Sequence, residues 1–211
     1  MTRTSTRRDA TRLRLYEAAV ALIGEQGFAA TTVEQIAERA GVAKGTVYYN
    51  FAGKTELFEE LLRHGVGPLT AALRDAAGAC RARGGGAGAA LDAMARAGLA
   101  FVASRADFAR LLVAEQWRAN RPWSATLRAA RADVVAAVAD VLQEGVKDGE
   151  LDEALDVELT AGALLGTVMV GALDWRTFHP GRTLDEVHAA LSPVLLARLG
   201  EAGGRGHAGG R

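Results

Sequence analysis

The segment AKGTVYYNF, residues 43–51, carries side chains that suit contacts with a polyanion. Ammonium, hydroxyl and phenol groups donate hydrogen bonds to phosphate oxygens and to the edges of bases. In a short helix with Val47 facing inward, the polar residues stay exposed. Four of them are candidates for such contacts: Lys44, Thr46, Tyr48 and Tyr49. The segment therefore indicates a nucleic-acid interface.

A helix of this length needs support from its neighbours. About seven residues span only ~10 Å and do not hold a helix in isolation. Thr32 and Gln35 have capping-box spacing, so a preceding helix is predicted over about residues 32–40. Gly41 then supplies the tight turn, where a positive φ is cheap only for glycine. The pattern predicts a helix-turn-helix, braced by a first helix and by a helix beginning near Lys54.

The rest of the chain is also predicted to be helical. It has 211 residues, 49% of them hydrophobic and only four prolines, and its apolar residues recur with a helical period. Helices are expected near residues 9–26, 32–40, 43–49, 54–80 (interrupted at Gly65–Pro68), 88–104, 107–119, 122–148, 155–178 and 184–199. The fold class is therefore all-α, with about nine helices: an N-terminal three-helix helix-turn-helix domain followed by a C-terminal helical bundle.

The charge of the chain is balanced overall, with 25 Lys and Arg against 25 Asp and Glu, which excludes a strongly basic nucleic-acid binder. Residues 1–14 are an exception, because five arginines stand against Asp9, a net of 5 − 1 = +4. We expect residues 1–8 to form a mobile basic arm, and the arginine cluster from Arg3 to Arg14 to steer the protein towards a nucleic acid. The glycine-rich residues 200–211 are predicted to be a disordered tail.

The string GVAKGTVYYNFAGKTELF, residues 41–58, resembles the DNA-binding signature of the TetR family of bacterial transcriptional regulators. That signature combines a Gly-Val, a Lys-Gly-Thr, a Tyr-x-x-Phe and a Lys-x-x-Leu, which stand here at Gly41-Val42, Lys44–Thr46, Tyr48–Phe51 and Lys54–Leu57. The match covers about residues 12–60. It implies a DNA-binding domain at residues 9–53 and a domain for effector binding and dimerisation at residues 54–199.

By this resemblance the protein is a homodimer whose third helix enters the major groove of a palindromic operator in double-stranded DNA. Residue-by-residue transfer places four residues at or near bases: Lys44, Gly45, Thr46 and Tyr48. It places three others at phosphates: Thr32, Tyr49 and Lys54. The family dimerises through its last two long helices, which implies interface contacts from Leu165, Val168, Met169, Ala172, Leu191 and Leu195.

Several large apolar residues in the middle of the chain leave two interpretations open. Ordinary core packing explains each of them, but together they also suit an apolar cavity for a small effector, formed among helices near residues 88–148. The candidate cavity residues are Met94, Phe101, Phe108, Leu112, Trp117 and Trp123. The resemblance favours a hydrophobic or amphipathic ligand that releases a repressor from DNA.

Other classes of function find little support. The four histidines lack metal-ligand spacing, and no GxSxG or complete P-loop occurs, so we expect no catalytic residue, metal or cofactor. The longest apolar run, residues 161–173, is too short for a membrane span and predicts a buried helix. We expect a cytoplasmic, nucleoid-associated regulator. A helical-bundle interaction protein, an activator and a regulator without ligand remain as alternatives.

Overall fold

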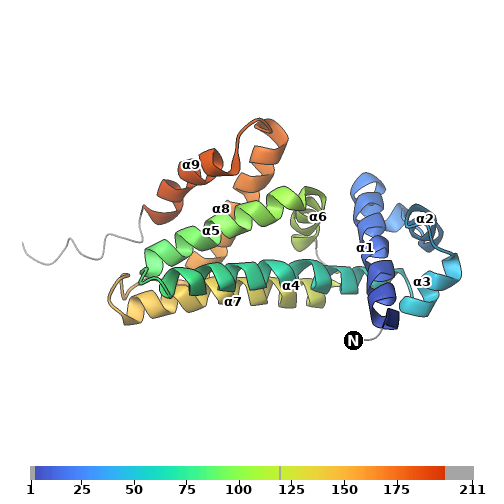
Figure 1. The fold of residues 1–211 in the computed structure, drawn as a ribbon, viewed down its shortest axis with the longest axis horizontal. Coiled ribbons are helices and arrows are strands. Elements are labelled where there is room, and N and C mark those ends of the chain that lie inside the picture. The colour runs from blue at the N-terminus through green and yellow to red at the C-terminus, as the bar shows by residue number, and fades with distance from the viewer. Residues whose placement is uncertain (1–2, 119, 198–211) are drawn as a thin grey trace, which may run out of the picture. The chain divides into compact units, whose positions relative to one another are not determined.

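The computed structural model describes residues 3–118 and 120–197, which form nine α-helices and contain no strand (Figure 1). In chain order the helices are α1 (Arg3–Ala30), α2 (Val33–Arg39), α3 (Lys44–Asn50), α4 (Lys54–Arg81), α5 (Ala87–Ser104), α6 (Ala106–Gln116), α7 (Ser124–Lys147), α8 (Val157–Phe178) and α9 (Leu184–Leu196). The all-α prediction is confirmed. The predicted tail, residues 200–211, lies outside the described residues.

The chain divides into two compact units. The N-terminal unit contains the residues up to Gly65 together with Asp107–Ala130. The C-terminal unit contains Val66–Ala106 and the residues from Arg131 onwards. The start of α4 therefore packs with α1 to α3. The predicted boundary between the DNA-binding domain and the effector-binding domain, at residues 53 and 54, stays a prediction.

Short-range signals account for the junctions between the first helices. Thr32 Oγ1 accepts a hydrogen bond from the Gln35 backbone N–H at 3.2 Å, and Gln35 Oε1 accepts one from the Thr32 N–H at 2.8 Å. These two bonds are the predicted capping box at the start of α2. Gly41 has a φ of 64° and makes the turn into α3. The local sequence therefore sets the angle at which α3 leaves α2.

Two helices are longer than the sequence indicated. α1 begins at Arg3, within the segment predicted as an arm, and it passes Gly27, which forms a kink with a φ of 82° instead of ending the helix. α4 continues through Pro68 without the predicted interruption. Proline removes one backbone hydrogen bond, but Leu69 and Leu73 beyond it are buried. Burial of their side chains stabilises the helix across this position.

In the C-terminal unit, α5 lies against both α8 and α9, and α8 also contacts α9 (Figure 1). The buried side chains of α8 are Ala161, Val168, Ala172 and Trp175. Among the described helices, α8 is long and apolar enough to span a membrane by length and composition, and 17% of its most apolar stretch is buried. The prediction of a buried helix was therefore wrong for the single chain, because α8 buries one side only.

Candidate nucleic-acid interface

Six of the seven predicted interface residues lie on α3 or at the start of α2, and the seventh, Lys54, is the first residue of α4. Val47 is the buried side chain of α3, and Phe51 immediately after the helix is buried as well. Thr46 is half-buried, and Tyr49 is 77% exposed. Four further residues of the predicted set are exposed: Thr32, Lys44, Gly45 and Tyr48. The two buried residues anchor α3 and leave its polar face open to a partner.

Arg8 of α1 adds a positive group beside this face. Its guanidinium carbon lies 5.8 Å from the centre of the Tyr49 ring, close enough for a cation–π attraction. The sequence indicated only that the first arginines steer the protein, because nothing local links residue 8 to residue 49. The contact arises because α1 packs on α2 and α2 packs on α3, and it extends the candidate interface beyond the predicted residues.

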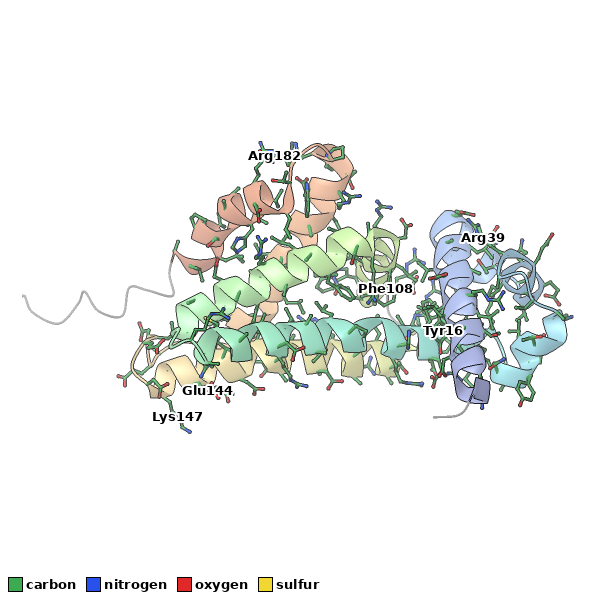
Figure 2. The ribbon with its side chains drawn as sticks, viewed as in Figure 1. Tyr16, Arg39, Phe108, Glu144, Lys147 and Arg182 are labelled. Atoms are coloured by element: carbon green, nitrogen blue, oxygen red, sulfur yellow. The ribbon has the colours of Figure 1, made fainter. Side chains whose placement is uncertain are left out.

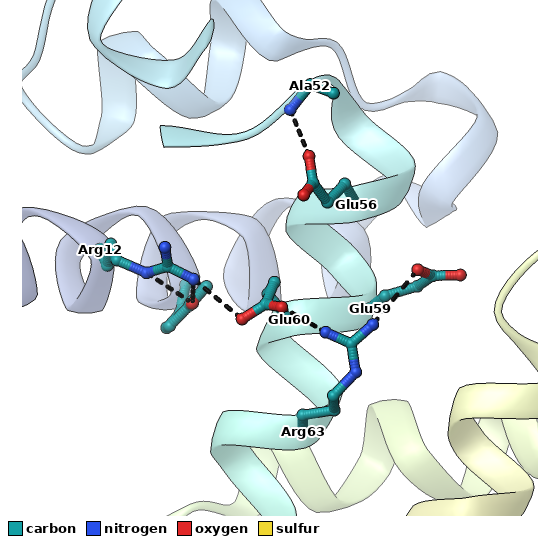
Figure 3. A network of polar contacts seen from close by, with 7 residues as sticks. Arg12, Ala52, Glu56, Glu59, Glu60 and Arg63 are labelled. Carbon is teal, nitrogen blue, oxygen red and sulfur yellow. Dashed lines mark hydrogen bonds and ion pairs between the residues drawn. The ribbon is translucent and has the colours of Figure 1, made fainter. Parts of the chain in front are cut away.

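A network of polar contacts fastens α1 to the start of α4 (Figure 3). The Arg12 guanidinium donates hydrogen bonds to the Tyr16 hydroxyl at 3.0 Å and to Glu60 Oε2 at 2.9 Å. It also lies 4.7 Å from the centre of the Phe51 ring. Arg63 reaches Glu60 from the other side. The network holds the helix that carries Arg8 in a fixed place relative to α3 and α4.

Lys44 forms an ion pair with Glu34, which stands in the first turn of α2. Both side chains are more than half exposed. The hydrogen bond from Lys44 lowers the pKa of the Glu34 carboxyl, and Glu34 in turn raises the pKa of the Lys44 ammonium. In the free protein, Glu34 thus neutralises the positive charge of Lys44. A DNA phosphate or base must compete with Glu34 for the Lys44 ammonium.

Glu34→Gln is expected to raise the affinity for mixed-sequence duplex DNA by several-fold at low salt. The change frees Lys44 and removes a negative charge that repels phosphate. Fluorescence anisotropy of a labelled duplex, at low and at physiological salt, measures the effect. The control is Glu38→Gln, which removes the same charge from an exposed position of α2. Equal gains from both substitutions would show that only net charge matters.

The Lys54 side chain is held by contacts within the protein and does not project freely into solvent. Its ammonium donates hydrogen bonds to the carbonyl oxygens of Phe28 and Thr31, both at 2.7 Å, and lies 4.3 Å from the centre of the Phe28 ring. Partial burial lowers the pKa of Lys54. Two of its three donors therefore cap the end of α1. One donor is left for a phosphate, so the phosphate contact stays a prediction.

Lys54→Met is expected to lower the free energy of unfolding by about 1.5–3 kcal/mol, because two partly buried carbonyls lose a charged donor while the apolar stem stays. Urea denaturation measures the loss. Lys147→Met serves as the control, since Lys147 is exposed in the last turn of α7. If Lys54 also binds phosphate, Lys54→Met should reduce the slope of the logarithm of DNA affinity against the logarithm of salt concentration by about one. Equal stability of the two variants would contradict the capping role.

The predicted cavity residues are divided between the two units. Phe108 and Trp123 belong to the N-terminal unit, whereas Met94 and Phe101 belong to the C-terminal unit. Phe108 lies on α6 (Figure 2). Its ring occupies the space beside Gly65, so closely that a Cβ at residue 65 would overlap it. Leu112 is also buried, and Trp117 is 81% exposed. For Phe108, Trp117 and Trp123, the structure gives no support to a shared pocket.

Trp123 instead belongs to an aromatic core. Its ring centre lies 4.2 Å from that of Phe28 and 4.7 Å from that of Phe58. Its indole Nε1 donates a hydrogen bond at 3.2 Å to Glu115, a buried carboxylate. Arg118 also contacts this carboxylate, at 3.4 Å. The cluster ties α6 to the ends of α1 and α4 within the unit that carries α3.

An apolar cavity does lie in the C-terminal unit, and Met94 is the predicted residue that lines it. The wall is made by α4, α5, α7, α8 and α9, with members such as Leu69, Leu73, Met94, Gly98, Val168 and Leu195. Four residues predicted for the dimer interface also line it: Leu165, Val168, Met169 and Leu195. Ala172 is buried, and Leu191 packs beside Gly171. Periodicity marked these residues as apolar without showing which surface they meet.

Two family profiles match the chain. The one described as "Bacterial regulatory proteins, tetR family" matches residues 15–61, and the one described as "Tetracyclin repressor-like, C-terminal domain" matches residues 84–179. The HTH-type transcriptional repressor KstR2 of Rhodococcus jostii is 30% identical over 197 residues, which cover 89% of this chain and 90% of that protein. The chain belongs to the TetR family. This TetR-family protein is a DNA-binding transcriptional regulator, as predicted.

Other TetR-family proteins extend the comparison. KstR2 of Mycobacterium tuberculosis is 46% identical, but over 61 residues that make up 30% of that protein. FadR of Bacillus subtilis in complex with stearoyl-CoA has a TM-score of 0.74 and 24% identity, covering 90% of this chain and 98% of that chain. The ketosteroid regulator KstR2 of Mycobacterium tuberculosis has a TM-score of 0.70 and 26% identity, covering 90% and 95%. Both KstR2 proteins are named as repressors, which supports a repressor here.

Proposed function

We propose that this TetR-family regulator is a cytoplasmic homodimeric repressor that binds a palindromic operator and leaves it when a small hydrophobic or amphipathic ligand enters the C-terminal unit. The observation that carries the proposal is the exposed face of α3. A helix of seven residues that buries Val47 and presents Lys44, Tyr48 and Tyr49 to solvent suits entry into a major groove. Thr46 and Gly45 complete the base-facing set, and Thr32 and Tyr49 suit phosphates.

A second copy of the chain is the partner that suits the open side of α8. Four exposed residues of α8 follow a helical spacing on the side opposite its buried residues: Leu159, Ala163, Gly166 and Val170. Two of them are large and apolar, and the small pair between them permits close approach of another helix. Phe178 and Val194 add exposed apolar surface near the ends of α8 and α9. An exposed apolar stripe of this kind marks an interface.

The cavity of the C-terminal unit is the proposed effector site. It is lined by apolar side chains from five helices, and relatives with the same fold are described with stearoyl-CoA or as ketosteroid regulators. A ligand that binds better to the DNA-free conformation lowers operator affinity through a shared equilibrium, with a coupling of typically 1–3 kcal/mol. The ligand and the operator then oppose each other.

A mobility-shift assay with DNA from upstream of the protein's own operon, followed by footprinting, tests the proposal. Two protected half-sites should lie about one helical turn, ~34 Å, apart. Transcription in vitro from that DNA should fall when the protein is added, whereas an activator would raise it. A protein that binds this DNA no better than mixed-sequence DNA would instead be an interaction protein with a structural helix-turn-helix.

A further inference from the structure

The ion pair between Glu34 and Lys44 joins the two helices of the helix-turn-helix at their N-terminal ends. Glu34 is the second residue of α2, and Lys44 is the first residue of α3. The Lys44 ammonium also lies 5.9 Å from the centre of the Tyr48 ring, so a carboxylate and an aromatic ring both hold it. Because the two charged groups are in contact, a base that meets Lys44 also lies within reach of Glu34.

Glu34 places a carboxylate at a surface that should meet a polyanion. An ionised carboxylate accepts hydrogen bonds but donates none, and phosphate oxygens, guanine N7 and O6, and thymine O4 are acceptors as well. In the major groove only the amino groups of cytosine N4 and adenine N6 donate hydrogen bonds. More than half of the Glu34 side chain is exposed. Inside the groove, its carboxylate is therefore satisfied at an amino group of a base.

The two side chains of the pair prefer the two bases of a single base pair. Lysine donates to N7 and O6 of guanine, and glutamate accepts from N4 of cytosine. Guanine O6 and cytosine N4 are hydrogen-bonded to each other, so they lie side by side at the edge of the G·C pair. A donor and an acceptor in contact on the protein thus match an acceptor and a donor in contact on the DNA. An A·T pair offers no two adjacent acceptors to the ammonium, and it adds the thymine methyl group.

We infer that Glu34 and Lys44 together read one G·C base pair in each half-site, with Lys44 on the guanine and Glu34 on the cytosine. This inference rests on the proposed entry of α3 into the major groove. Glu34 repels phosphate on DNA of any sequence, and a cytosine amino group at the right position offsets that repulsion. Specificity is a difference of affinities, so a group that weakens binding to every other sequence raises discrimination.

Selection by the full-length protein from a pool of duplexes of randomised sequence, followed by fluorescence anisotropy, tests the inference. The natural protein should select a G·C pair at one position of each half-site, and its exchange for A·T should weaken binding by about tenfold. Glu34→Ala and Lys44→Ala should each lower that penalty severalfold, at this position only. The matched control is Glu38→Ala, an exposed carboxylate about one turn further along α2, which should keep the full penalty. Alanine favours a helix at all three exposed positions, so the variants fold.

A modified duplex isolates the contact of Glu34 from that of Lys44. N4-methylcytosine still pairs with guanine, but a methyl group replaces the amino hydrogen that faces the major groove. It should weaken binding by the natural protein, by Lys44→Ala and by Glu38→Ala, and it should leave Glu34→Ala unaffected. A Glu34 that acts only through its charge would give equal gains on all sequences when replaced by alanine, with unchanged sensitivity to the methyl group. That result would overturn the inference.

The outcomes also separate this inference from the proposed function. A protein that selects no sequence from the pool would contradict both. A selected palindromic site in which Glu34→Ala and Lys44→Ala relax different base pairs, or none, would overturn the inference and leave the proposed function standing. Relaxation of the same G·C pair by both variants, with the control unchanged, would support it.

Discussion

Val170→Arg is expected to turn the dimer into monomers, raising the dissociation constant of the dimer by about a thousandfold or more. Val170 is the last of the four residues of the apolar stripe of α8 and is 61% exposed in the single chain. In a symmetric dimer the substitution occurs twice, and each arginine would be buried without a partner at a cost of several kcal/mol. Operator affinity should fall with the dimer, because one half-site alone binds weakly.

The folded monomer should survive this change. Arginine favours a helix more than valine does, and the exposed position leaves no core contact to lose. Sedimentation velocity measures the mass, and circular dichroism confirms that the helices remain. The control is Ala136→Arg, which places the same charge on an exposed position of α7. A dimer that persists in Val170→Arg, or that dissociates equally in both variants, would exclude this face of α8 as the interface.

Trp123→Ala is expected to lower the free energy of unfolding by about 4 kcal/mol or more. Trp123 is 1% exposed, and its ring fills the space beside Phe28 and Phe58. Removal of a large buried aromatic ring costs about 3–5 kcal/mol. Glu115, a buried carboxylate, also loses the indole donor. Because whole domains are stable by only about 5–15 kcal/mol, this single change brings the N-terminal unit close to unfolding.

Two variants divide this effect into its parts. Trp123→Phe keeps an aromatic ring in place and removes the N–H donor, so it should cost about 1–3 kcal/mol. Trp117→Ala should change the free energy of unfolding by less than about 0.5 kcal/mol, since Trp117 is largely exposed. Urea denaturation followed by circular dichroism measures all three. A loss for Trp117→Ala as large as that for Trp123→Ala would contradict the assignment of Trp123 to the aromatic core.

The helix-turn-helix could be predicted because its signals are local. The capping box at Thr32, the positive φ at Gly41 and the inward position of Val47 each depend on residues within one or two turns of the chain. The same is true of the all-α class and of the helix order, which follow from the apolar period. The face of α3 that meets solvent could be read in the same way, since a seven-residue helix with one buried side chain leaves its polar residues outside.

Other features depended on contacts between residues far apart in the chain. Lys54 meets carbonyls that lie 26 and 23 positions away, so its capping role has no local signal. Trp117 and Trp123 look alike in the sequence, yet one is exposed and the other is enclosed by α1 and α4. Helical period shows which side of a helix is apolar, but only the packing of the helices decides what that side meets. For the same reason, four residues predicted for a dimer interface on α8 and α9 also line the cavity of the single chain, and their contact with a second copy stays a prediction.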